Sequence, residues 1–352
     1  MQNPWILVTG ASGFIGSTIV RKLVERGEKV KGLVRPGADL RPLKGLPPEN
    51  FQLAVGEVTV DHTVFRALAG CSQLYHAAGT FKLGNRHARE VIDGSVLSMR
   101  GALEAARRRG LENIVVTSSV AALGVTRSKS ELMEEDHDFN LHDPDPYILA
   151  KRRAHDVIEE FVSKGLPVVT VMPSSVYGPG DWKPTPTGAG IIEYLGLSPS
   201  MHVPVSTGGI SVVDVEDVAQ GHILAMMYGE VGSSYALGGE NVTFEQFFQM
   251  LADITGLAEP SAPKSPAETA LLARLFELRE WLTGKPLSFT YRLARDYGDA
   301  YAWVSSRRAK EELGYTHRPA RETLARSVRW FLQHGYVPEP AAHRVRLELR
   351  PV

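Results

Sequence analysis

Residues 5–27 read WILVTGASGFIGSTIVRKLVERG, and this stretch decides the fold. It opens with an apolar run typical of a buried strand and continues with apolar residues at helical spacing that end at Gly27. Gly10, Gly13 and Gly16 follow the strand and open the helix. Glycines allow a tight turn and let the backbone approach a pyrophosphate, which binds free N–H groups at the helix start. The stretch therefore predicts a nucleotide-binding unit.

The rest of the first half repeats this alternation of strand and helix. Further apolar, strand-like runs lie at residues 29–34, 51–58, 71–79, 113–119 and 167–178, and the longest helical pattern covers 146–165. Strands that alternate with helices of this length are typical of a parallel sheet built from right-handed crossovers. We therefore expect an α/β protein with a Rossmann-type, doubly wound parallel sheet of six or seven strands.

The composition changes after residue 178, where a loop rich in proline and glycine begins. We assign residues 1–178 to the cofactor-binding domain and expect 205–240 to return to it. Residues 179–204 and 241–335 are expected to form a smaller, mostly helical substrate-binding lobe, and 336–352 a loose C-terminal tail.

The overall composition excludes several kinds of partner. Lys and Arg total 39 of 352 residues and Asp and Glu total 40, so charge gives no reason to expect nucleic acid or an anionic membrane. No apolar run is long enough to span a membrane, and the start lacks the pattern of a signal peptide. The single cysteine, Cys71, fits a reducing cytoplasm, and the histidines show no spacing that predicts a metal site.

The end of the second strand bears on which dinucleotide binds. An acidic residue there would accept hydrogen bonds from the ribose hydroxyls of NAD, but this chain has Arg35 after Val34. A guanidinium at this place can bind the 2′-phosphate of NADP. Arg35 therefore favours NADP over NAD, and the alternative is an ordinary solvated arginine in a loop.

A serine, a tyrosine and a lysine are placed to form a catalytic group. Ser118 and Ser119 end the fifth strand, on the edge where parallel sheets bind ligands. Tyr147 and Lys151 lie one turn apart on one face of the long helix, so the ammonium group is expected to lower the pKa of the phenol. Taken singly, each would be read as a strand-end serine or a surface pair. Behind a glycine motif they indicate acid–base chemistry beside a nicotinamide.

These motifs resemble the extended short-chain dehydrogenases/reductases over residues 5 to about 330. The likeness rests on the three glycines, the YHAAG stretch at 75–79, Ser119 and the Tyr147–Lys151 pair. The second half resembles the dihydroflavonol-4-reductase-like branch, and within it the bacterial hopanoid-associated sugar epimerases most closely. The resemblance implies that Tyr147 is the general acid or base, that Lys151 is its electrostatic partner, and that the Ser119 hydroxyl binds the substrate carbonyl.

The resemblance also implies a set of cofactor-binding residues. These are Gly10, Ser12, Gly13, Phe14, Ile15, Gly16, Arg35, Glu57, Val58, Ala77, Ala78, Gly79, Thr117, Tyr147, Lys151, Pro173, Ser175 and Val176. The chain departs from the family pattern at two of its positions: Glu57 stands where many members have Asp, and Ser95 stands where they have Asn.

Three functions are compatible with this reading. The first is an NAD(P)H-dependent oxidoreductase that reduces a ketone or aldehyde to an alcohol, with Tyr147 as the proton donor. The second is a nucleotide-sugar epimerase or dehydratase that retains its NAD. The third is a non-catalytic NAD(P)-binding sensor that docks a partner protein. The substrate is expected to be a small carbonyl compound or a sugar, and the family resemblance suggests a homodimer.

Overall fold

A seven-stranded parallel sheet forms the centre of the molecule. In this computed structural model, residues 4–79, 88–261, 265, 268, 274 and 291–346 are described. The strand order is β10-β6-β5-β4-β1-β2-β3, and every neighbouring pair is parallel. The strands are β1 (Trp5–Thr9), β2 (Val30–Val34), β3 (Phe51–Val55), β4 (Cys71–His76), β5 (Asn113–Thr117), β6 (Val168–Pro173) and β10 (Ser234–Leu237).

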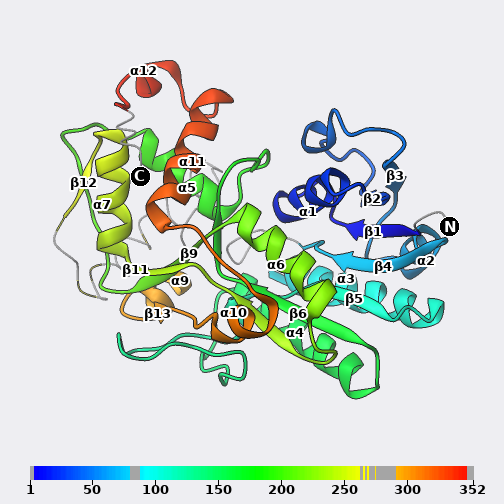
Figure 1. The fold of residues 1–352 in the computed structure, drawn as a ribbon. Helices are drawn as coiled ribbons and strands as arrows, with labels where there is room; N and C mark the ends of the chain where they lie inside the picture. Colours follow the sequence, from blue (N-terminus) through cyan, green and yellow to red (C-terminus); the bar gives the residue numbers. More distant parts are fainter. Residues whose placement is uncertain are drawn as a thin grey trace.

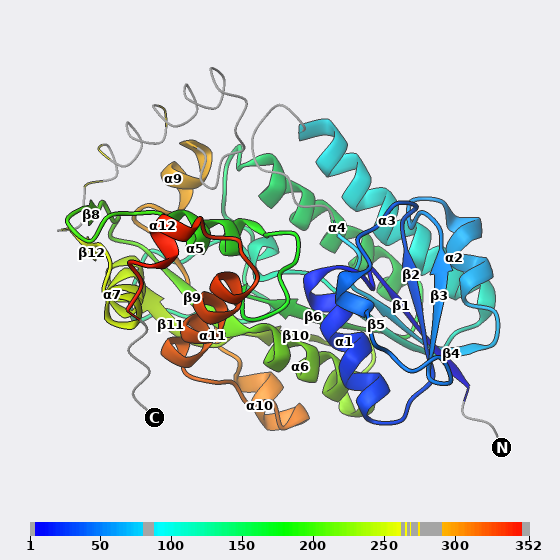
Figure 2. The same cartoon turned by 90° about the horizontal axis from the view of Figure 1, so that it is seen from above.

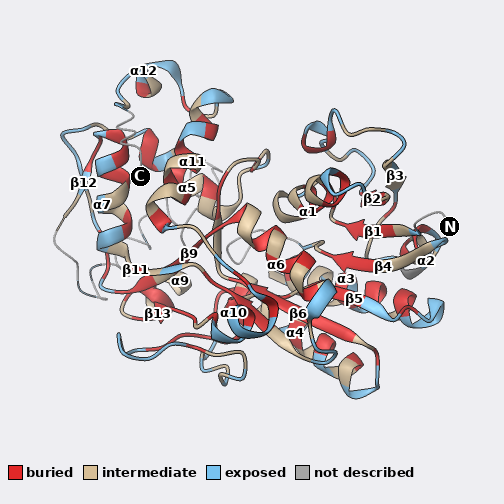
Figure 3. Ribbon diagram, in the orientation of Figure 1, coloured by how far each residue is buried: buried red, intermediate tan, exposed pale blue. Residues whose placement is uncertain are grey.

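Helices cover both faces of this sheet (Figure 1). The helices α1 (Phe14–Glu25) and α6 (Val215–Tyr228) pack together on one face. The other face carries α2 (Asp61–Ala67), α3 (Ala88–Arg109) and α4 (Pro146–Ser163), and the view from above separates the two layers (Figure 2). Each layer encloses its own apolar cluster against the buried strands (Figure 3). The predicted Rossmann-type, doubly wound α/β fold is confirmed.

The order of the strands indicates where a ligand would bind at one edge of the sheet. From β1 the chain runs outward through β2 and β3, then returns to add β4 on the other side of β1. In such sheets a ligand binds outside the carboxyl ends of the strands, where the order reverses. Here that point lies between the ends of β1 and β4, which carry Gly10 and Ala77.

The remaining elements form a second, mostly helical part beside the sheet. Its small sheet joins β9 (Gly209–Asp214), β11 (Glu240–Thr243), β13 (Tyr301–Ala302) and β7 (Ser175–Tyr177). Its helices are α5 (Pro186–Leu195), α7 (Phe244–Thr255), α9 (Tyr291–Tyr297), α10 (Arg307–Leu313), α11 (Ala320–Gln333) and α12 (Glu339–Ala342), and the short strands β8 (His202–Val203) and β12 (Glu259–Pro260) pair. A third apolar cluster packs α5, α7 and α11 together.

The C-terminal segment expected to be a loose tail contains structure. Residues 339–342 form α12, and the amide of Arg346 donates to the carbonyl oxygen of Thr255 at 2.8 Å. The division of the chain into domains stays a prediction, although β10 and α6 of the 205–240 segment do lie in the main sheet and its helical layer. Within the described ranges, no helix has the length and apolar character needed to cross a membrane, and no group of His, Cys, Asp and Glu side chains is placed to hold a metal ion.

Candidate active site at the carboxyl edge of the sheet

The turn between β1 and α1 depends on three glycines that pack against one another and against the end of β4. Gly10 has a positive φ of 67°, and a Cβ there would lie 2.7 Å from the Cα of Ala78. The amide of Gly13 donates to the carbonyl oxygen of Gly10 at 2.8 Å. A Cβ at Gly16 would lie only 2.2 Å from that same oxygen. Larger side chains would therefore force this turn apart.

Helix α1 starts at the carboxyl edge of the sheet, directly after the glycine turn. Its N-cap is Gly13, and in the described part of the chain no side chain caps the helix start. Gly13 is exposed and Ser12, Phe14 and Ile15 are half-buried, so the amides of this turn can be approached by a ligand. Uncapped N–H groups at the positive end of a helix bind phosphate. The geometry fits the pyrophosphate of a dinucleotide.

Replacing Gly16 with Ala is expected to weaken dinucleotide binding at least ~10-fold, because the new methyl group would push the turn away from the Gly10 oxygen. Gly190 in α5 is a matched control, since a Cβ there would have no atom of the described residues within 4 Å. Calorimetric titration with NADPH and NADH would measure both variants. Unchanged affinity in Gly16→Ala would contradict a phosphate-binding turn.

Arg35 and Glu57 lie at the ends of β2 and β3. The Arg35 side chain is exposed and makes no hydrogen bond or ion pair with the residues that the structure describes. Glu57 and Val58 are half-buried, and the carbonyl oxygen of Val58 lies 2.7 Å from the position of a Cβ at Gly101 on α3. Arg35 is thus open to a ligand at this edge, and Gly101 allows α3 to pack against the backbone after β3.

The other predicted cofactor residues lie at the same edge. Ala77 and Ala78 are half-buried and Gly79 is exposed after β4, and Thr117 ends β5. Pro173 ends β6 and is buried, whereas Ser175 and Val176 begin β7 and are half-buried. Because the strands of the main sheet are parallel, their carboxyl ends share one edge, and β7 starts two residues after β6 ends there. The predicted cofactor residues are therefore gathered on one side of the sheet, as a dinucleotide site requires.

Ser119 follows β5 and caps the 3-10 helix η3 (Val120–Ala122). Its Oγ accepts a hydrogen bond from the amide of Ala121 at 3.2 Å. The hydroxyl proton of Ser119 is therefore available for a substrate oxygen. Helix η3 packs against α4, which brings Ser119 to the helix that carries the tyrosine and the lysine.

Tyr147 lies in the first turn of α4. Pro146 opens this helix, and the carboxylate of Asp145 caps it by accepting a hydrogen bond from the amide of Tyr147 at 2.9 Å. The ammonium nitrogen of Lys151 lies 5.6 Å from the centre of the Tyr147 ring. The expected pairing of these two side chains on one helix face is present.

The electrostatics of this pair differ from the sequence-based expectation. Burial, assisted by the carboxylate of Asp145, raises the pKa of Tyr147 above its ordinary 10.0. Burial also lowers the pKa of Lys151 from 10.5 to about 8. The pKa of Tyr147 is raised and not lowered as expected, because burial of the phenol and the nearby carboxylate of Asp145 both disfavour its ionised form.

Tyr147 packs against an apolar cluster. This cluster draws on η3, on the loop before α4 and on α9: Ala121, Val125, Phe139, Leu141, Leu293 and Tyr297. Tyr297 is 9 % exposed, and burial together with the phenol of Tyr147 raises its pKa. Periodicity alone did not indicate α9 as part of the site, since the contact is made between segments far apart in the sequence.

Two arginines of α9 hold the loop that leads into the catalytic helix. The Arg292 Nη1 donates to the carbonyl oxygen of Pro144 at 3.0 Å and lies 3.0 Å from an Asp143 carboxylate oxygen. The Arg295 Nη2 donates to the carbonyl oxygens of His142 and Asp143 at 3.1 and 2.8 Å. Asp143 has a φ of 47°, unusual for a residue with a side chain. Helix α9 therefore supports the start of α4.

Ser95, at the position where the family has Asn, is half-buried on α3. Helix α3 packs along α4 over most of its length, so Ser95 lies in the helical layer that supports Tyr147 and Lys151. A serine hydroxyl reaches less far than an asparagine amide, and the position therefore offers a shorter polar group to this layer.

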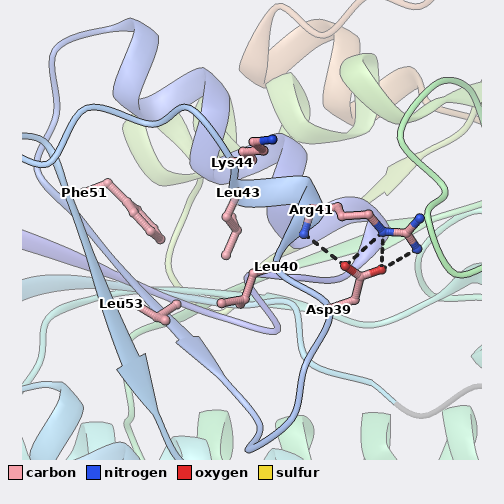
Figure 4. A pocket seen from close by; sticks show the side chains of 7 residues that line it. All are labelled: Asp39, Leu40, Arg41, Leu43, Lys44, Phe51 and Leu53. Atoms are coloured by element: carbon pink, nitrogen blue, oxygen red, sulfur yellow. Dashed lines mark hydrogen bonds and ion pairs between the residues drawn. The ribbon is translucent and has the colours of Figure 1, made fainter.

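A separate hollow of about 470 Å³ lies beside β3 and the 3-10 helix η1 (Arg41–Leu43), as Figure 4 shows. Its apolar lining comes from Leu40, Leu43, Phe51 and Leu53. The Arg41 guanidinium at its rim is bonded to Asp39, at 2.6 Å for the shortest contact. None of the predicted site residues lines this hollow. It is distinct from the candidate active site.

Comparison with known proteins identifies the family. Residues 6–238 match the model of the NAD dependent epimerase/dehydratase family. The chain belongs to this epimerase/dehydratase family. The resemblance to the extended short-chain dehydrogenases/reductases is thereby confirmed, and the chain is an NAD(P)-dependent enzyme.

Relatives within the family span nearly the whole chain. A putative dihydroflavonol 4-reductase of Synechocystis sp. is 32% identical over 349 residues, covering 95% of this chain and 98% of its own. Sterol demethylase protein B of Methylococcus capsulatus is also 32% identical, covering 94% and 99%. The crystal structure of gox2253 is similar with a TM-score of 0.81 and 35% identity, over 95% of this chain and 100% of that one. Relatives of this epimerase/dehydratase member thus include proteins named as reductases.

Proposed function

We propose that this enzyme reduces an uncharged ketone or aldehyde to an alcohol with NADPH. The observation that carries the proposal is the setting of Tyr147, a phenol that burial keeps protonated, within an apolar cluster and one turn from Lys151. A protonated phenol suits the donation of a proton to a carbonyl oxygen, which is the reducing direction. The apolar surroundings suit a substrate without charge at its reacting end.

Ser119, Tyr147 and Lys151 have different roles at the substrate carbonyl group. The Ser119 hydroxyl donates a hydrogen bond to the carbonyl oxygen, because its own oxygen already accepts from the Ala121 amide. Tyr147 then transfers its phenolic proton to that oxygen as the carbonyl carbon is reduced. A bound nicotinamide dinucleotide supplies the hydride. Lys151 stabilises the phenolate that remains until a proton from solvent restores the phenol.

Arg35→Ala tests the choice of NADPH. The wild-type protein is expected to bind NADPH at least ~10-fold more tightly than NADH, since a charge-assisted hydrogen bond to phosphate contributes roughly 1.5–3 kcal/mol. The substitution is expected to remove that preference, measured by titration calorimetry of cofactor-stripped protein. Arg41→Ala removes the same charge from the 3-10 helix η1 a few residues further on, but its guanidinium is already bonded to Asp39, so the preference is expected to remain. Equal affinity of the wild type for both cofactors would remove the main support for a reductase.

A nucleotide-sugar epimerase or dehydratase is the second candidate. The family match favours it, and similar folds include the UDP-glucose 4-epimerase of Thermus thermophilus in complex with NAD, at 22% identity and a TM-score of 0.71. Such an enzyme would purify with tightly bound NAD and would show no net consumption of NADPH. Cofactor analysis of freshly purified protein therefore separates the two candidates before any substrate is known.

A further inference from the structure

Three consecutive hydroxyl groups at the end of β5 point in three directions. Thr117 Oγ1 lies 2.8 Å from Nε2 of His222 on α6, and Ser118 Oγ lies 3.1 Å from Nδ1 of His155 on α4. The third hydroxyl, of Ser119, faces its own backbone at the Ala121 amide. Successive side chains of a strand alternate between faces, so the two histidines hold the strand end from opposite layers.

His155 belongs to the helix that carries the other two catalytic candidates. It lies eight residues after Tyr147 and four after Lys151, which places the three side chains along one side of α4. Ser118 immediately precedes Ser119. The contact between Ser118 and His155 therefore ties the strand end that carries Ser119 directly to the helix that carries Tyr147 and Lys151.

The direction of this hydrogen bond follows from the surroundings of the imidazole. His155 and Ser118 are 5 % and 8 % exposed, and the Nε2 of His155 lies 3.5 Å from a carboxylate oxygen of Glu159. The ring proton belongs on Nε2, facing that carboxylate, so Nδ1 accepts the proton of the Ser118 hydroxyl. Burial lowers the pKa of His155, which keeps this neutral form.

We propose that His155 is a positioning residue that sets the distance between Ser119 and the Tyr147–Lys151 pair. The proposal rests on the proposed function, in which these three side chains act on one carbonyl group. Besides this hydrogen bond, buried apolar side chains of α4 and β5 share one cluster, whose packing is less directional than a hydrogen bond. A displacement of about 1 Å between reacting groups can cost ~100-fold in rate.

The test compares His155→Leu with His155→Asn, whose side-chain oxygen can accept the same Ser118 proton. With NADPH and benzaldehyde as the probe, His155→Leu is expected to lower kcat at least ~10-fold while KM for NADPH changes less than about twofold. His155→Asn is expected to recover kcat to within about threefold of the wild type. Ser118→Ala should resemble His155→Leu, and the double variant should lose little more than either alone.

A second readout does not depend on catalysis. Only the neutral amine of Lys151 reacts with acetic anhydride. The extent of this reaction, measured by mass spectrometry at a series of pH values, therefore reports the pKa of the amine, which depends on its burial. In His155→Leu the reactivity profile is expected to shift to higher pH, towards that of an ordinary lysine. Tyr315→Phe is the control, because it also loses a buried hydrogen bond, to the carbonyl oxygen of Gly238 at 3.0 Å, away from the site.

The two readouts separate failure of the proposal from failure of the proposed function. If the wild type reduces no benzaldehyde but the Lys151 profile shifts in His155→Leu and not in Tyr315→Phe, the positioning role stands and the reductase assignment loses support. If His155→Leu only lowers the melting temperature, with kcat and the Lys151 profile unchanged, His155 is a packing residue and the proposal is overturned.

Discussion

Tyr147→Phe is expected to lower kcat for carbonyl reduction roughly 1,000-fold, the scale of a lost general acid. The phenylalanine ring can still pack against the apolar cluster that contains Tyr297 but has no proton to give. Cofactor affinity is expected to stay within about threefold, since the main phosphate and ribose contacts would lie elsewhere on the sheet edge. Steady-state rates with NADPH, together with calorimetric titration, measure both quantities.

Tyr297→Phe provides the matched control for this loss. Tyr297 is another tyrosine in the same apolar cluster, and the proposed reaction gives its hydroxyl no proton to transfer. Its substitution is expected to change kcat less than about tenfold. If Tyr147→Phe retained more than a tenth of the wild-type kcat, the proton would have to come from another group and the assignment of Tyr147 would fall.

Local sequence patterns were sufficient to predict the strands, the turn and the helix that carry the site. The glycine turn, the strands and the helix that starts at Pro146 all follow from short stretches whose spacing reflects their own geometry. The capping box at the start of α7, in which the Thr243 and Gln246 side chains each accept from the other residue's backbone amide, is a local feature of the same kind. Such features depend on neighbours in sequence, so a single chain is enough to read them.

The supports of the site could not be predicted because their partners are distant in sequence. Ser118 and His155 are 37 residues apart, and Thr117 and His222 are 105 apart. Arg292 reaches Pro144 across 148 residues. No periodicity or motif relates such pairs, and a single histidine in a helix does not by itself indicate a partner. The direction of the Tyr147 pKa shift was predicted wrongly for the same reason. Desolvation of the phenol depends on the segments that pack around the ring, and these are distant in sequence.

Lys151→Met is expected to lower kcat at least ~100-fold and to raise the thermal stability at the same time. The ammonium group would stabilise the phenolate that forms as Tyr147 gives up its proton, and a thioether cannot. The same ammonium group is costly to bury, as its lowered pKa indicates. Activity and stability are thus expected to move in opposite directions at this position.

The pH dependence of stability distinguishes this explanation from simple repacking. In the folded chain the pKa of Lys151 is about 8, whereas the ordinary value is 10.5. Below about pH 8 the amine is charged in both states, so the folded state carries the full cost of burying the charge. Between pH 8 and 10.5 the unfolded chain binds the proton and the folded chain does not, so the stability of the wild type rises with pH. The advantage of Lys151→Met should therefore be largest near neutral pH and shrink as pH approaches 10.5.

Denaturant unfolding of both proteins across this pH range measures the difference. Lys164→Met is the control, since Lys164 follows the same helix with its side chain 62% exposed and paired with Glu160. That substitution is expected to leave kcat unchanged and to give no stability gain that fades with pH. A gain in Lys151→Met that stayed constant at every pH would mean that the methionine only packs better. Burying the charge of Lys151 would then cost little folding free energy. The argument that the site keeps this cation for catalysis, at the expense of stability, would no longer hold.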